Sequence, residues 1–242
     1  MIRSIAVVPH PPLLVPELVG AAAAEVEPLR TACRQAVRRL GVPRWHAIGA
    51  DPGGPALVAP DTHGSFRGFG ADVPVSLRDG APADLREPSD TPLPLLVAGW
   101  LRAQAGAHTV VGELVHPAAA PDDCLARGKE LADELNRDPR QSWAVLVLAD
   151  GARTHPAPGA GRVDERAAGF DAAVATALAV VDPEALAGLD PELATELGAG
   201  GRAAWQLLAG VAIGSGSAWT GELLYSAAPY GVGYHVAVWE PR

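Results

Sequence analysis

Histidine and aspartate side chains follow several of the apolar segments that are typical of β-strands. These residues are His10 after residues 5–8, Asp51 after residues 45–50, and Asp150 and His155 after residues 143–148. An imidazole ring exchanges a proton near neutral pH, and carboxylates accept protons or bind cations. Because ligands of open α/β sheets bind beyond the carboxyl ends of the strands, we expect these side chains to share one site.

The segment 150–162 carries the densest group of these side chains. It follows the most apolar predicted strand and contains Asp150, Arg153 and His155 among glycines and prolines. Long loops of this kind are often functional, so we expect it to form the rim of a cleft in which His155 can exchange a proton near neutral pH. The guanidinium of Arg153 could pair with Asp150 or with an anionic ligand. In the structural alternative, both residues only tie the loop down and His155 is solvated.

Two further histidines lie in loops that could reach the same site. His63 is in a glycine-rich loop between short predicted strands, and His116 precedes a proline at the end of the predicted strand 109–115. Either ring can bind a metal ion or exchange a proton. The alternatives are that His63 and His116 are solvated loop residues, and that Asp51 caps a turn.

Apolar periodicity predicts an alternation of strands and helices along the chain. The predicted strands are 5–8, 45–50, 57–59, 73–77, 109–115, 143–148, 221–226 and 233–239. The predicted helices are 22–40, 93–104, 122–136, 164–180, 183–189, 191–197 and 202–212. Because strands alternate with helices in the first part of the chain, we expect crossover helices on both faces of the sheet. The expected fold is a three-layer α/β/α domain over residues 1–242, with a mostly parallel or mixed central sheet.

Composition and charge exclude several classes of function. The formal net charge is −9 at pH 7 and Lys129 is the only lysine, which argues against binding to nucleic acid or anionic membranes. No apolar stretch approaches the roughly 20 residues that span a bilayer. The short apolar start lacks a cleavage site, so we expect a cytoplasmic protein. Cys33 and Cys124 form no CxxC pair, which argues against a zinc ribbon.

Four short motifs resemble, in order, those of the LigB-like superfamily. They are VPHPPLL at 8–14, GSFRGFG at 64–70, DGARTH at 150–155 and PYGVGY at 229–234. This superfamily includes the catalytic B subunits of class III extradiol ring-cleavage dioxygenases and the Memo proteins. The resemblance implies a LigB-like fold, an Fe(II) site and a small aromatic substrate. It also implies that His10 is the first metal ligand and that His155 is the acid–base residue near the substrate.

The sequence departs from this family at the other two metal ligands. Where the family has a second histidine, the matching turn reads GADPG at 49–53, with Pro52 near the ligand position. Where the family has Glu or Cys, the matching stretch reads AGGR at 199–202. A non-haem Fe(II) oxygenase needs two histidines and one carboxylate on one side of the metal. Asp51 and His63 could supply these donors beside His10.

Three functions therefore remain open. The first is a divergent LigB-like protein with an incomplete Fe(II) site and a retained cleft for a small molecule or a partner. The second is an active metal-dependent extradiol dioxygenase that cleaves a catechol-type ring with Fe(II) or another divalent metal. The third is a non-catalytic companion subunit of a dioxygenase-like complex. Because two ligands are missing, the sequence favours the first, with or without a metal, as a homo-oligomer or beside a companion subunit.

Overall fold

A mixed sheet organises the protein in the computed structural model, which describes residues 1–20, 23–80, 90–157 and 161–242. Its seven strands follow the order β3-β6-β2-β7-β1-β9-β8. The central strands β6, β2, β7 and β1 run parallel, whereas β3, β9 and β8 pair antiparallel at the two sides. The seven strands are β1 (Ile2–Val8), β2 (Arg44–Ala50), β3 (Ala56–Val58), β6 (Thr109–Val115), β7 (Trp143–Leu148), β8 (Trp219–Ala227) and β9 (Tyr234–Pro241).

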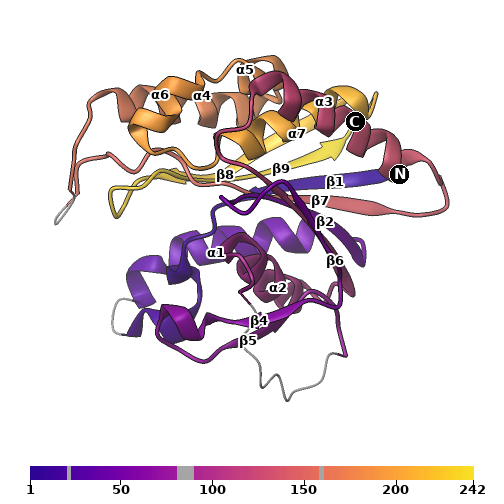
Figure 1. Ribbon diagram of the computed structural model, residues 1–242, viewed down its shortest axis with the longest axis horizontal. Coiled ribbons are helices and arrows are strands. Elements are labelled where there is room, and N and C mark those ends of the chain that lie inside the picture. The colour runs from indigo at the N-terminus through magenta and orange to yellow at the C-terminus, as the bar shows by residue number, and fades with distance from the viewer. Residues whose placement is uncertain (21–22, 81–89, 158–160) are drawn as a thin grey trace.

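Helices cover both faces of this sheet (Figure 1). The α-helices are α1 (Ala23–Arg39), α2 (Leu93–Ala105), α3 (Pro121–Asn136), α4 (Arg166–Val180), α5 (Pro183–Ala187), α6 (Pro191–Leu197) and α7 (Arg202–Gly214). Helices α1 and α2 pack on one face, and the other five pack on the opposite face. The expected three-layer α/β/α fold with a mixed sheet is therefore confirmed.

Strand β7 and residues 5–8 of β1 are buried on both sides, which explains their unbroken apolar sequences. In β7, Val145 and Val147 contact the core under helices α3 to α7, whereas Leu146 and Leu148 contact the core under α1 and α2. Successive strand side chains point to opposite faces, so a strand between two helical layers needs apolar residues throughout. Each fully buried Val or Leu contributes about 1.5–3 kcal/mol, which holds the start of the loop after β7 firmly.

Helix α4 has an apolar stripe that packs on the sheet and a solvent-facing remainder. Its buried positions recur every three or four residues and are Ala167, Phe170, Asp171, Val174, Ala177 and Leu178. This spacing places them on one face of the helix. Asp171 is the charged residue in this set, so α4 carries a carboxylate into the protein interior.

A small two-stranded sheet lies beside α2 and corrects one expectation. The strands expected at 57–59 and 73–77 are found as β3 and β5 (Pro74–Ser76). His63 was expected to lie in a loop, whereas it begins β4 (His63–Ser65), which pairs antiparallel with β5. The 3-10 helices η1 (Pro12–Leu14), η2 (Pro16–Leu18) and η4 (Phe66–Phe69) complete the described elements. The helix expected from residue 22 is seen from Ala23, and Ala22 is outside the described residues. None of the helices in the described ranges is long and apolar enough to cross a membrane.

Candidate functional site

A buried carboxylate in helix α4 holds His155 in place. Oδ2 of Asp171 lies 2.6 Å from Nε2 of His155, and Oδ1 accepts a hydrogen bond of 3.1 Å from the backbone N–H of Ala152. Asp171 is only 5% exposed, whereas the side chain of His155 is 13% exposed. An ionised carboxylate only accepts hydrogen bonds, so Nε2 of His155 carries the proton in this contact. The other ring nitrogen, Nδ1, is then left to accept a proton.

Two glycines leave room for this carboxylate. A Cβ atom added to Gly151 or to Gly233 would collide with the carboxylate oxygens of Asp171. The two backbones are joined by hydrogen bonds from Gly151 N to Gly233 O, 2.7 Å, and from Gly233 N to Ala152 O, 2.8 Å. The loop after β7 and the residues before β9 therefore form one wall against which Asp171 packs.

A second histidine lies on the same carboxylate. Nε2 of His235 is 3.4 Å from Oδ1 of Asp171, and its Nδ1 is 3.0 Å from the hydroxyl of Ser226. The ring is 1% exposed and its centroid is 6.0 Å from that of Trp205. Nε2 makes no hydrogen bond within the described residues. His235 is thus a buried neighbour of the His155–Asp171 pair, without contact with solvent.

His10 lies against the first residue after β7. The carboxylate of Asp150 accepts a hydrogen bond of 2.9 Å from the backbone N–H of His10, and Nδ1 of the His10 ring is 3.7 Å from the same oxygen. That Nδ1 is buried and has no hydrogen-bond partner in the described part of the chain. Burial, and then the charge of Asp150, raise the pKa of the Cys33 thiol and of the Tyr234 phenol. Both groups therefore stay protonated beside Asp150.

The two His–Asp pairs meet at the backbone of residues 150 and 151. The Asp150 side chain contacts His10, whereas the next residue, Gly151, faces the carboxylate of Asp171. No hydrogen bond or ion pair joins His10 to His155 within the described ranges. The two pairs are thus connected through the 150–151 backbone, and a site shared by His10 and His155 stays a prediction.

The loop after β7 is tied to three other segments. The N–H of Arg153 donates to Leu197 O at 3.0 Å, that of His155 to Gly231 O at 3.1 Å, and that of Asp164 to Thr154 O at 2.9 Å. The guanidinium of Arg153 lies against Gly198 and makes no ion pair with Asp150 in the described structure. Residues 158–160 of the predicted rim are outside the described residues. The anchoring makes residues 150–155 a fixed platform for the His155 ring.

The other expected site residues lie elsewhere. Oδ1 of Asp51 accepts a hydrogen bond of 2.8 Å from Gly53 N, which caps the turn after β2. His63 lies in β4, with Nδ1 3.4 Å from Asp61 O. His116 is exposed and accepts a hydrogen bond of 3.1 Å from Ala118 N, and it lines a pocket formed with α3 and α7. In the described residues no hydrogen bond or ion pair joins His116 to Asp150 or Arg153, and β2 lies between β6 and β7 in the sheet.

An iron centre of the oxygenase type needs three donors on one side of the metal. The described residues contain no group of three or more His, Cys, Asp or Glu side chains placed to hold a metal ion. His10, Asp51 and His63 are accordingly not gathered into one ligand set. The two-histidine, one-carboxylate arrangement of non-haem iron oxygenases does not fit the side chains of this site.

Sequence reasoning missed Asp171 and His235. Asp171 had a detectable signal, because it is a charged residue on the apolar stripe of a predicted helix. A carboxylate at such a position needs a partner when it is buried. His235 lies in the apolar run of the last predicted strand and gave only the weaker signal of a polar residue in a buried strand.

Comparisons with known proteins add a distant structural similarity. No protein-family model matches the chain, and no curated protein matches it. The structure is similar to the crystal structure of the uncharacterized protein JW3007 from Escherichia coli K12, with 12% sequence identity and a TM-score of 0.49. The alignment covers 98% of this chain and 99% of that chain. These values are too low for the similarity to carry a functional argument.

Proposed function

We propose that this protein is a divergent LigB-like protein that binds a small hydroxylated aromatic molecule through His155. In this proposal the Nδ1 atom of His155 accepts a hydrogen bond, and then a proton, from a phenolic O–H group. The observation that carries the proposal is the 2.6 Å contact between Nε2 of His155 and Oδ2 of Asp171. The substrate class comes from the four motifs that resemble the ring-cleavage dioxygenases.

The buried carboxylate suits His155 to this role. A carboxylate that accepts the Nε2 proton fixes the orientation and the tautomer of the ring and stabilises the imidazolium that forms on protonation. Asp171 is itself fixed by the Ala152 N–H and by the wall of Gly151 and Gly233. His155 is partly exposed, and Nδ1 has no hydrogen-bond partner among the described residues. A ligand O–H can therefore reach a base that is already oriented.

One observation favours the metal-dependent alternative. The buried Nδ1 atom of His10 lacks a hydrogen-bond partner and lies 3.7 Å from Oδ1 of Asp150. A nitrogen and a carboxylate oxygen in this relation are two donors of the kind that divalent metals accept. They are not a complete oxygenase ligand set, so we derive no oxygen chemistry from them.

Binding of catechol to the metal-free protein tests the proposal. Isothermal titration calorimetry in EDTA would compare catechol with 1,2-dimethoxybenzene, which has the same ring without an O–H group. We expect catechol to bind and the dimethoxy compound to bind at least about tenfold more weakly, because it cannot donate a hydrogen bond to Nδ1. Equal binding of the two compounds, or no binding of catechol, would refute the proposal.

A matched pair of histidine variants links the binding to His155. His155→Gln retains an N–H group that can reach Asp171 but removes the titratable base, so we expect catechol binding to be lost. His108→Gln makes the same change at an exposed histidine just before β6, near the amino ends of the parallel strands, and should bind catechol like the parent. Loss of binding in both variants, or in neither, would contradict the role of His155.

A further inference from the structure

A separate pocket lies on the sheet face that is covered by α3 and α7. Its volume is about 640 Å³, and it is bounded by β3, the end of β6, α3 and α7. Leu57, Val115 and Leu207 are among its apolar walls, and the side chain of Leu57 is 67% exposed. Ligand sites for small organic molecules have volumes of this order and mostly apolar walls. None of the residues of the His155 site lines this pocket.

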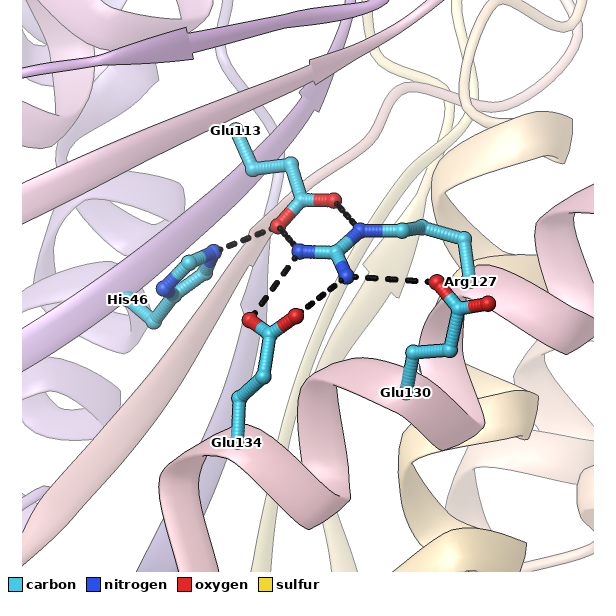
Figure 2. Close-up of polar contacts among 5 residues, drawn as sticks. All are labelled: His46, Glu113, Arg127, Glu130 and Glu134. Atoms are coloured by element: carbon cyan, nitrogen blue, oxygen red, sulfur yellow. Dashed lines mark hydrogen bonds and ion pairs between the residues drawn. The ribbon is translucent and has the colours of Figure 1, made fainter.

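The floor of the pocket holds a network of charges around Arg127 (Figure 2). The guanidinium donates to both oxygens of Glu113, at 2.6 and 3.1 Å, and to both oxygens of Glu134, at 2.8 and 3.3 Å. It also lies 3.5 Å from Glu130. A guanidinium has five N–H donors. The three carboxylates occupy all of them, so Arg127 has no donor left for an anionic ligand.

The network has a surplus of negative charge. Glu113, Glu130 and Glu134 surround the single cation of Arg127, and the buried His46 donates its Nε2 proton to Glu113 at 2.7 Å. The hydrogen bonds that Arg127 donates to Glu134 and Glu113 raise the pKa of Arg127, so its single positive charge is permanent. Three carboxylates against one guanidinium leave this network anionic, and two of the three, Glu113 and Glu134, line the pocket. The local field therefore attracts cations and repels anions.

Asp123 adds an unpaired carboxylate to the pocket lining. It is exposed in the first turn of α3 and makes no ion pair within the described residues. Glu134 is half-exposed, and its oxygens can each accept another hydrogen bond in addition to those from Arg127. These two side chains are the groups that a ligand ammonium could reach without breaking the network.

We propose that this pocket binds a small amine with an apolar body, such as an arylalkyl ammonium ion. The apolar walls cover the body, and the carboxylates of Glu134 and Asp123 accept hydrogen bonds from the ammonium group. Apolar walls alone would accept any small hydrophobic molecule. The unpaired Asp123 and the saturated Arg127 select the cation over its neutral and anionic analogues. The site is independent of the function proposed for His155.

Three ligands of nearly equal size test this selectivity. Isothermal titration calorimetry near pH 7 would compare phenethylammonium, 2-phenylethanol and 3-phenylpropanoate on the full chain. We expect the ammonium ion to bind at least about tenfold more tightly than the alcohol and the carboxylate to bind most weakly. Equal affinity for the ammonium ion and the alcohol, tighter binding of the carboxylate, or no binding of the ammonium ion would overturn the proposal.

Charge-neutralising variants locate the binding. Asp123→Asn and Glu134→Gln should each weaken phenethylammonium binding by about fivefold while the affinity for 2-phenylethanol is unchanged. Asp123 is exposed and unpaired, so its variant will fold even if Glu134→Gln is destabilised. Glu17→Gln, at an exposed glutamate of η2, is the matched control and should bind as the parent does. His155→Gln should also retain amine binding, which separates this proposal from the catechol binding proposed for His155. Unchanged amine affinity in both pocket variants would overturn it.

Discussion

Nε2 of His155 lies 2.6 Å from Oδ2 of Asp171, although one residue is in a loop after β7 and the other is in the buried stripe of α4. The contact joins the loop at the carboxyl end of β7 to a helix that covers one face of the sheet. It also gives a buried carboxylate the hydrogen-bond partners that it needs. The same pair therefore contributes to stability and prepares His155 for proton exchange.

Asp171→Asn should lower the stability of the protein and weaken proton exchange by His155. The amide has the same size but cannot compensate the charge of a protonated His155. In either orientation its NH₂ group would also face one of the N–H donors, Ala152 N or His155 Nε2, that the carboxylate accepts from. We expect a loss of about 1–3 kcal/mol in the free energy of unfolding, measured with urea, and loss of catechol binding. Asp133→Asn, at an exposed position of α3, is the control and should change neither quantity. A fully stable Asp171→Asn protein that binds catechol normally would show that the pair is not used.

Gly233→Ala should displace the Asp171 carboxylate. The new Cβ atom would be too close to the carboxylate oxygens for any real contact, and the 151–152 backbone on the other side prevents a simple shift. We expect a loss of about 1–3 kcal/mol in the free energy of unfolding, as for other overpacked sites, together with weaker catechol binding.

Gly169→Ala is the matched control for that substitution. Gly169 lies on the exposed side of α4, and a Cβ atom there would meet nothing within 4 Å. Alanine in a helix interior is more favourable than glycine by about 0.5–1 kcal/mol, so this variant should be slightly more stable than the parent. Equal stability of the two variants would mean that the glycine at residue 233 has no role in seating Asp171.

Iron content separates the metal-independent proposal from an active dioxygenase. Because the described residues gather no three-donor site, we expect protein purified without added metal to contain far less than one iron per chain. Elemental analysis measures this directly, and oxygen uptake with catechol in air is the companion assay. Near-equimolar iron together with ring cleavage would favour the dioxygenase alternative.

The strands and helices could be predicted from the sequence because their signals are local. The apolar run of β7 and the apolar stripe of α4 are each patterns of residues close together in the sequence, and the predicted ranges agree with the structure to within a few residues. The strand of His63 was missed because β4 is short and is defined by its pairing with β5. Such pairing joins segments that are separated in the sequence, so local patterns carry little information about it.

The candidate site could be predicted only in part for the same reason. His10, Asp150 and His155 were found because each follows a predicted strand, and strand ends can be read locally. Their connection to Asp171 depends on how α4 packs on the sheet, which no local pattern specifies. His116 was expected in the same cleft, and the structure shows that β2 lies between the strands β6 and β7 that precede His116 and Asp150. Strand order is a global property, and it decides which strand ends become neighbours.

The buried Glu113 should make the stability of the protein depend on pH in acid. Burial by itself would raise the pKa of this carboxyl group, but the hydrogen bonds from His46 and Arg127 outweigh it and hold the pKa below the ordinary value of 4.5. A carboxyl group whose pKa is lower in the folded than in the unfolded state stabilises the protein at pH values above its unfolded-state pKa. That contribution is lost as the pH falls through the folded-state pKa.

Glu113→Gln should therefore be less stable than the parent near pH 7, by about 1–2 kcal/mol, because a neutral amide replaces a carboxylate that is hydrogen-bonded to Arg127 and His46. Below pH 4.5 the parent should lose stability more steeply than the variant, and the two curves should converge. Urea unfolding at a series of pH values from 7 to 3 measures both effects, with Glu17→Gln as the control that should follow the parent throughout. Parallel curves for the parent and Glu113→Gln would show that folding does not change the pKa of Glu113, and that the hydrogen bonds from His46 and Arg127 do not selectively stabilise its charged form.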